Sequence, residues 1–165
     1  MKTYNIIFFI ILQSFISVIF SQEIRDGFEV YPRENVTSFE DLNFNKYSTH
    51  PLDKNGRATE VVNFDFYSIA KLKEIVLEQY CTEKQKRMGE DYTPVVVLLV
   101  RASDGEIVAV SFNFYDLQDP SLIDTKKLQA MRRKMMDELS FENLLFRGDK
   151  AVSGCMTWHA FLFRL

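Results

Sequence analysis

The chain reads VVVLLV over Val95–Val100 and IVAVSFNF over Ile107–Phe114, with Ser103-Asp104-Gly105-Glu106 between the two runs. Both runs are rich in β-branched and aromatic residues, which favour strands. An Asp-Gly pair between two such runs predicts a two-residue type I′ turn, because both central residues of that turn need positive φ. The sequence therefore predicts an antiparallel β-hairpin, and this hairpin decides the fold.

The turn also determines which residues face each other across the hairpin. With Asp104 and Gly105 at its tip, Leu99 is expected opposite Val110 and Val97 opposite Phe112. One face would then be wholly apolar and carry Val95, Val97, Leu99, Val110, Phe112 and Phe114. The other face would be partly apolar and carry Val96, Leu98, Val100, Ala109, Ser111 and Asn113. We expect the first face to be core and the second to be half-covered.

A helical pattern of apolar residues precedes the hairpin, and another follows it. The first helix is expected from about Ser68 to Gly89, with the apolar stripe Ile69, Leu72, Val76 and Tyr80. The second helix is expected after a capping box at Ser121–Asp124, with the apolar stripe Leu128, Met131, Met135 and Leu139. Each helix has one apolar face, so both are expected to pack on a sheet.

Three further strands are expected at Thr59–Phe66, Phe141–Phe146 and Cys155–Leu165. The resulting order of the main elements is strand–helix–hairpin–helix–strand. This order predicts an α+β fold, in which two helices pack on one face of an antiparallel sheet. Residues 58–165 are expected to form this single domain. Residues 22–57 are polar with scattered aromatics, and they predict an irregular N-terminal arm with one short strand near Phe28–Tyr31.

The first residues have the pattern of a signal peptide. Lys2 lies in a short polar segment, residues 6–20 are largely apolar, and Ser21 is a small residue at a plausible cleavage point. The apolar run is shorter than the roughly 20 residues that a membrane-spanning helix needs. Cleavage after Ser21 would leave 144 of the 165 residues, with a net charge of −4 in place of −3. The mature chain is then expected to be exported, periplasmic or secreted, and not membrane-spanning.

Composition excludes several classes of protein. Hydrophobic residues make up 47% of the chain and aromatic residues 14%, which is typical of a globular domain and not of a disordered one. With 20 basic and 23 acidic residues, the chain has no general basic field for binding nucleic acid.

The two cysteines are Cys81 and Cys155. In an oxidising compartment they are candidates for one disulfide, which would close a long loop and stabilise the fold by about 4–5 kcal/mol. The alternative is two separately buried thiols, because a free cysteine packs as a small hydrophobic residue. The sequence leaves both alternatives open, because it does not give the Cα separation.

No motif predicts catalysis, a cofactor or a metal. The two histidines, His50 and His159, lack a second ligand at the spacing of a helical zinc site, and no nucleophile elbow or phosphate-binding glycine loop is present. Cys155 and His159 lie four positions apart on an expected strand, which separates them by about 13 Å. A Cys–His dyad needs hydrogen-bond contact, so this pair fails unless the chain bends.

From Pro94 to Leu165 the order of features resembles the carboxy-terminal domain of TonB-type energy transducers. The matching features are Val95–Val100, Asp104-Gly105, Ile107-Val108, Ala130-Met131-Arg132-Arg133, Phe141-Glu142, Gly154 and Phe161–Leu165. The resemblance implies an envelope protein of a Gram-negative bacterium, with a small α+β domain that binds a partner through an exposed strand. The chain departs from that family because its leader looks cleavable and it has no long Pro-rich spacer. The leader also resembles those of small exported Bacteroidetes proteins of unknown function.

We therefore expect an exported, non-catalytic interaction module of the bacterial envelope, whose partner is an envelope protein or peptide bound at an exposed strand. One alternative is an exported enzyme whose site is assembled from distant residues, such as His159 with a carboxylate of the arm. The other is a membrane-anchored envelope subunit that retains its leader.

Overall fold

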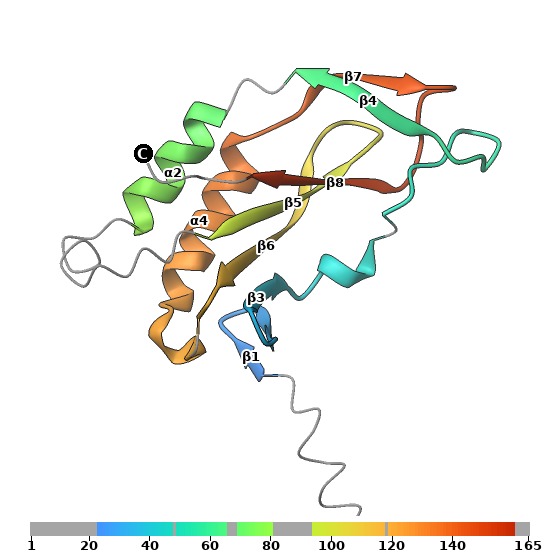
Figure 1. The fold of residues 1–165 in the computed structure, drawn as a ribbon. Coiled ribbons are helices and arrows are strands. Elements are labelled where there is room, and N and C mark those ends of the chain that lie inside the picture. The colour runs from blue at the N-terminus through green and yellow to red at the C-terminus, as the bar shows by residue number, and fades with distance from the viewer. Residues whose placement is uncertain (1–22, 48, 66–68, 81–93, 118, 161–165) are drawn as a thin grey trace, which may run out of the picture.

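The computed structural model describes residues 23–47, 49–65, 69–80, 94–117 and 119–160. Their strands are β1 (Glu23–Arg25), β2 (Phe28–Pro32), β3 (Val36–Asp41), β4 (Glu60–Asp65), β5 (Val95–Arg101), β6 (Ile107–Tyr115), β7 (Glu142–Arg147) and β8 (Cys155–Ala160). The helices are α2 (Ile69–Tyr80) and α4 (Thr125–Glu138), with short 3-10 turns η1 (Phe44–Lys46) and η2 (Pro120–Leu122). Six strands form an antiparallel sheet in the order β1-β2-β3-β6-β5-β8, and β4 pairs with β7 separately (Figure 1).

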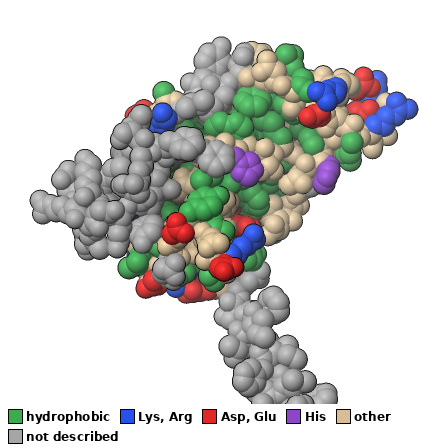
Figure 2. Space-filling model, viewed as in Figure 1, with side chains coloured by type: hydrophobic (Ala, Val, Ile, Leu, Met, Phe, Trp, Pro, Cys, Tyr) green, Lys and Arg blue, Asp and Glu red, His purple; other side chains and the backbone are tan. Residues whose placement is uncertain are grey.

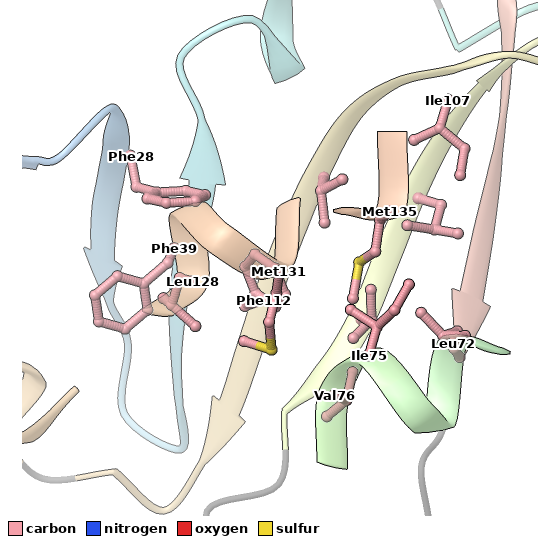
Figure 3. Close-up of a cluster of buried hydrophobic side chains, with 14 of the residues drawn as sticks. Phe28, Phe39, Leu72, Ile75, Val76, Ile107, Phe112, Leu128, Met131 and Met135 are labelled. Carbon is pink, nitrogen blue, oxygen red and sulfur yellow. The ribbon is translucent and has the colours of Figure 1, made fainter. Parts of the chain in front are cut away.

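The predicted α+β class is confirmed, because both helices pack on one face of the antiparallel sheet (Figures 1 and 3). Buried side chains of the two helices meet those of the sheet in one core; α2 contributes Leu72, Ile75 and Val76, and α4 contributes Leu128, Met131 and Met135. All of these residues except Ile75 belong to the two apolar stripes expected from the sequence. The expected capping box at Ser121–Asp124 is wrong: Asp124 caps α4 by accepting a hydrogen bond from the Lys126 amide at 3.1 Å, and Ser121 lies in η2.

The expectation of an irregular arm over 22–57 is wrong, because residues 23–41 contain three strands of the sheet. β3 pairs with β6 from Val36 opposite Tyr115 to Glu40 opposite Ser111. The boundary expected near residue 57 therefore does not separate this segment from the domain. Its apolar residues alternate with charged ones, and the few that face the helices, such as Phe39, are completely buried. An alternation over so few residues predicts a strand only weakly, because β-propensity depends on the neighbouring strands.

The hairpin is confirmed, but its turn differs from the prediction. The Arg101 amide donates to the Glu106 carbonyl and the Gly105 amide donates to the Arg101 carbonyl, each at 2.8 Å. The loop therefore spans four residues, 102–105. Gly105 has φ of +82°, whereas Asp104 does not have positive φ, so the turn is not type I′.

The longer loop and a bulge between Leu99 and Val100 together shift the register by one residue. Leu98 lies opposite Val110 and Val96 opposite Phe112, in place of the expected Leu99 and Val97. Because side chains alternate between the two faces of a strand, this shift reverses the two faces of β5. Val96, Leu98 and Val100 face the helices, whereas Leu99 belongs to a smaller cluster with Val108, Ala109 and Cys155.

The strand expected at Thr59–Phe66 is present as β4, but it does not join the main sheet. It pairs with β7, the strand expected at Phe141–Phe146, to form a two-stranded unit that we call the β4–β7 ribbon. In Figure 1 the ribbon lies above β8, and the loop between β5 and β6 reaches toward it. Its inner side chains reach the core, because Phe64 and Leu144 pack against the main cluster.

Candidate functional site

The candidate site is the outer edge of β8, the strand that ends the six-stranded sheet. On its inner side β8 pairs with β5, from Cys155 opposite Arg101 to Ala160 opposite Val96. On its outer side, no strand among the described residues pairs with it. An edge strand presents a row of backbone N–H and C=O groups that are not used within its own sheet. Such a row is a template for a further strand.

The side chains of β8 alternate between two different environments. Met156 and Trp158 point to the helix side, where both are half-buried against the core. Thr157 and His159 point to the opposite side and are exposed. The edge therefore has one apolar side and one polar side.

Aromatic rings connect the apolar side of β8 to the β4–β7 ribbon. The rings of Trp158 and Phe141 meet edge to face with centroids 5.6 Å apart. Phe141 meets Phe64 of β4 in the same manner at 5.1 Å. The space-filling view shows hydrophobic side chains gathered in this part of the molecule, between β8 and the ribbon (Figure 2). Phe141 is completely buried, whereas Phe64 and Trp158 are only half-buried.

The structure does not bring His159 together with the carboxylate that shares its row on the sheet. The row runs from His159 through Val97 and Ser111 to Glu40 of β3. Three strand spacings separate the two ends, or about 14 Å, so no hydrogen bond joins them. His159 is exposed on the sheet face opposite the helices, and His50 is exposed in the loop before β4. A dyad of Cys155 and His159 is not formed either, because both lie on one regular strand.

Cys155 is 2% exposed and packs in the cluster with Leu99, Val108 and Ala109. Burial raises the pKa of its thiol, which keeps it protonated and poorly nucleophilic. Cys81, its candidate disulfide partner, lies outside the described residues. The disulfide therefore stays a prediction.

Two neighbouring acidic residues of β3 make contacts within the fold. Asp41 is buried and its carboxylate binds the Arg132 guanidinium of α4. Burial raises the pKa of the neighbouring Glu40, whose carboxylate accepts a hydrogen bond from Asn45 at 3.5 Å. Among the described residues, no group of three His, Cys, Asp or Glu side chains is placed to hold a metal ion.

Two shallow cavities flank the β5–β6 loop, with volumes of about 550 and 450 Å³. The larger contains Arg101, whose guanidinium is already paired with Asp104 and Glu106, each at 2.8 Å. The smaller is lined by residues of the loop together with Phe141 and Lys150. Neither cavity is lined by a histidine or a cysteine.

None of the described helices is both long enough and apolar enough to cross a membrane. The β8 edge and its apolar side are not recognisable as a site in the sequence. The apolar residues of 155–163 indicated a strand, but only the sheet order shows that this strand is the last one.

Comparison with known proteins identifies a similar fold. The structure is similar to that of a DUF5043 family protein from Bacteroides uniformis, determined by crystallography at 1.85 Å resolution. The TM-score is 0.59 and the sequence identity 13%, over 84% of this chain and 88% of the other. No protein-family profile matches the chain, and no curated protein matches it. At this identity the likeness concerns the fold, and the chain shares its α+β architecture with that protein.

Proposed function

We propose that this protein is an exported, non-catalytic interaction module of the bacterial envelope, and that it binds an extended segment of a partner protein along β8. The observation that carries the proposal is the position of β8 at the end of the sheet, where no described strand covers its outer edge. Strand addition at such an edge gains affinity from backbone hydrogen bonds and specificity from alternate side chains.

Two features of the sequence support the envelope setting. The leader with its cleavage point at Ser21 favours export. The order of elements from β5 through β6, α4 and β7 to β8 is also the order on which the resemblance to the TonB carboxy-terminal domain rests. That resemblance implies partner binding through an exposed strand. The chain lacks the long Pro-rich spacer of an energy transducer, so the proposal does not include energy coupling.

The local chemistry of β8 suits binding better than catalysis. Its exposed polar residues, Thr157 and His159, have no carboxylate opposite them on the neighbouring strand β5, where Leu99 and Val97 lie. Backbone pairing needs an edge without a partner strand, and among the described strands none pairs with the outer edge of the six-residue β8, although Leu52 pairs with Ser153 just before it. A partner strand of similar length would continue the sheet by one strand.

Site-specific photo-cross-linking in cells that express the full chain tests this proposal. A benzophenone amino acid is placed at Thr157, which is exposed on β8. The matched control carries it at Lys126, which is exposed on α4, away from the edge. We expect an adduct with an envelope protein from position 157 and none from position 126. Equal labelling at both positions, or no adduct at 157, would contradict the proposal.

Export is tested separately by the intact mass of the protein recovered from outside the cytoplasm. Cleavage after Ser21 predicts a chain that begins at Gln22. A mass that includes residues 1–21 would favour the membrane-anchored alternative. A protein found only in the cytoplasm would contradict export altogether.

A further inference from the structure

We infer that the larger of the two cavities beside the β5–β6 loop binds a neutral, hydroxyl-rich ligand of the monosaccharide class. This inference goes beyond the proposed function and is independent of it, because no residue of β8 lines the cavity. It follows from the size of the cavity, an exposed tyrosine in its lining and a mixed set of hydrogen-bond donors and acceptors.

Three segments that are far apart in the sequence form the walls of this cavity. Asn43 and Tyr47 come from the two ends of η1, residues 101 and 106–108 from the hairpin, and residues 136, 137, 139 and 140 from the end of α4. A backbone bridge between Glu106 and Ser140 joins the second segment to the third. The volume of about 550 Å³ lies within the range of roughly 300–1,000 Å³ that small-molecule sites occupy.

Tyr47 gives this cavity an aromatic ring that a ligand can reach. The residue is 38% exposed, and its hydroxyl has no hydrogen-bond partner among the residues that the structure describes. A tyrosine has an apolar ring and a polar tip, so it contacts both the C–H groups and a hydroxyl of one ligand. The smaller cavity lacks this feature, because its aromatic residue, Phe141, is completely buried.

Arg101 contributes hydrogen-bond donors that its two ion pairs leave unused. Both pairs use the same nitrogen, because Nη1 donates to Asp104 and to Glu106, each at 2.8 Å. Its Nε–H and Nη2–H groups have no hydrogen-bond partner within the described part of the chain. Asn43 adds the N–H groups of its side-chain amide, whose oxygen accepts a hydrogen bond from Lys46 at 2.8 Å. The cavity therefore has N–H donors from two of its three walls.

The third wall contributes acceptors. Asp137 is exposed on the last turn of α4, and among the described residues its carboxylate has neither an ion pair nor a hydrogen bond. The hydroxyl of Ser140, three residues further on, both donates and accepts. A sugar hydroxyl does the same, so a ligand with several adjacent hydroxyls uses the donors and the acceptors of this cavity together.

Charged ligands fit the same groups less well. An anion such as phosphate would be repelled by the carboxylates of Glu106 and Asp137, and the charge of Arg101 is already neutralised by its two partners. An ammonium ion would pair with Asp137, but it has no acceptor and would leave the N–H groups of Arg101 and Asn43 unused. A neutral ligand with hydroxyls avoids both penalties.

Titrations of the ¹⁵N-labelled mature protein, followed by its amide chemical shifts, test the inference. The probes are glucose, galactose, mannose, xylose and N-acetylglucosamine, with inorganic phosphate and butylammonium as the charged alternatives. We expect at least one sugar to shift the amide signals of residues 101–108 and 136–140, with saturation in the millimolar range. Phosphate and butylammonium should bind there at least tenfold more weakly than that sugar.

The chain offers a matched control for each of two cavity residues. Tyr47→Ala is compared with Tyr115→Ala, because Tyr115 is also exposed but does not line the cavity. Asp137→Ala is compared with Asp149→Ala, because Asp149 is exposed in the loop after β7. The two cavity variants should weaken sugar binding at least fivefold, and the two controls should change it less than twofold. All four side chains are exposed, and urea unfolding shows that each variant stays folded.

Three results would overturn the inference. The first is the absence of saturable shifts at the cavity with all five sugars. The second is tighter binding of phosphate or butylammonium than of any sugar, and the third is an equal loss of sugar binding in a cavity variant and its control. Each of these results leaves the proposed function in place, because strand binding at β8 is measured separately by the adduct at Thr157.

Discussion

The carbonyl oxygen of Phe141 lies where a side chain on residue 105 would have to stand: a Cβ built on Gly105 would be 1.8 Å from it. The Phe141 amide also donates to the Gly105 carbonyl at 3.0 Å. This pair of contacts fastens the β5–β6 loop to the chain that connects α4 with β7. Phe141 in turn contacts Trp158 and Phe64, so the hairpin loop helps to position the ribbon beside β8.

Gly105→Ala is therefore expected to lower the free energy of unfolding by at least about 3 kcal/mol, because left-handed φ costs about 1–2 kcal/mol and the backbone overlap adds to it. Gly56→Ala is the control: Gly56 has a similar φ of +73° but no atom within 4 Å of its Cβ position. This control should lose only about 1 kcal/mol. Urea unfolding measures both. Similar losses of unfolding free energy in the two variants would show that the overlap with Phe141 adds nothing to the cost of the substitution.

The ion pair between Arg132 and Asp41 is expected to stabilise the attachment of α4 to β3. The Asp41 side chain is 1% exposed, so removing its cation leaves a buried carboxylate without its counter-ion. Arg132→Gln should therefore lower the free energy of unfolding by about 2–4 kcal/mol. Arg147→Gln removes an exposed pair with Glu60 and should cost less than about 0.5 kcal/mol. An Arg132 variant as stable as the Arg147 variant would contradict this prediction.

The Tyr31 hydroxyl is expected to lose its proton at a higher pH than an ordinary tyrosine, because its pKa is raised. Its hydroxyl donates to the Glu29 carboxylate, which raises the pKa of Tyr31 from its ordinary value of 10 to about 12. Between pH 10 and 12 the unfolded chain loses this proton while the folded chain keeps it, so the stabilisation present below pH 10 declines as pH rises toward 12. Ultraviolet titration of tyrosinate should show a late step that Tyr31→Phe removes. In Glu29→Gln that step should move back toward pH 10, and an unchanged step would contradict the role of Glu29.

The buried thiol of Cys155 is expected to be unreactive in the folded protein. In a Cys81→Ser variant, which leaves Cys155 as the single thiol, reaction with a disulfide reagent at pH 8 should be at least roughly tenfold slower than in the urea-unfolded chain. The reason is the 2% exposure of Cys155 together with its raised thiol pKa. Equal rates in the two states would show that β8 opens readily at this end.

The disulfide between Cys81 and Cys155 is tested by counting thiols in the denatured mature protein. A disulfide predicts no free thiol before reduction and two afterwards. Two free thiols before reduction would contradict it and leave Cys155 as a buried hydrophobic residue of β8.

The sequence predicted those elements whose pattern is long and local. Leu128, Met131 and Met135 recur at helical spacing over about two turns, and they lie on the buried face of α4. The runs that became β5 and β6 are long and rich in β-branched residues, so they predicted strands without knowledge of their neighbours. Of the three strands in residues 23–41, only β2 was expected, near Phe28–Tyr31. The strands β1 and β3 were missed because their apolar residues are few and β3 is completed only by pairing with β6.

The hairpin register shows the limit of local inference most clearly. Asp104-Gly105 indicated a turn, and Gly105 does adopt positive φ. The structure has a four-residue loop, whose Gly105 lies against Phe141, a residue distant in the sequence. The longer loop and the bulge between Leu99 and Val100 together give a one-residue shift, which exchanges the two faces of β5 and places Leu98 in the main core in place of Leu99.

By itself, then, the sequence determined the α+β class, the central hairpin and the two amphipathic helices, because periodicity along a chain reflects which side chains must avoid water. Only the tertiary structure shows that β8 ends the six-stranded sheet. It also shows that β4 and β7 pair separately from that sheet. Strand order depends on hydrogen bonds between segments far apart in the chain, which no local pattern records. The candidate site is the strand edge that this order creates. Only the folded structure therefore shows it.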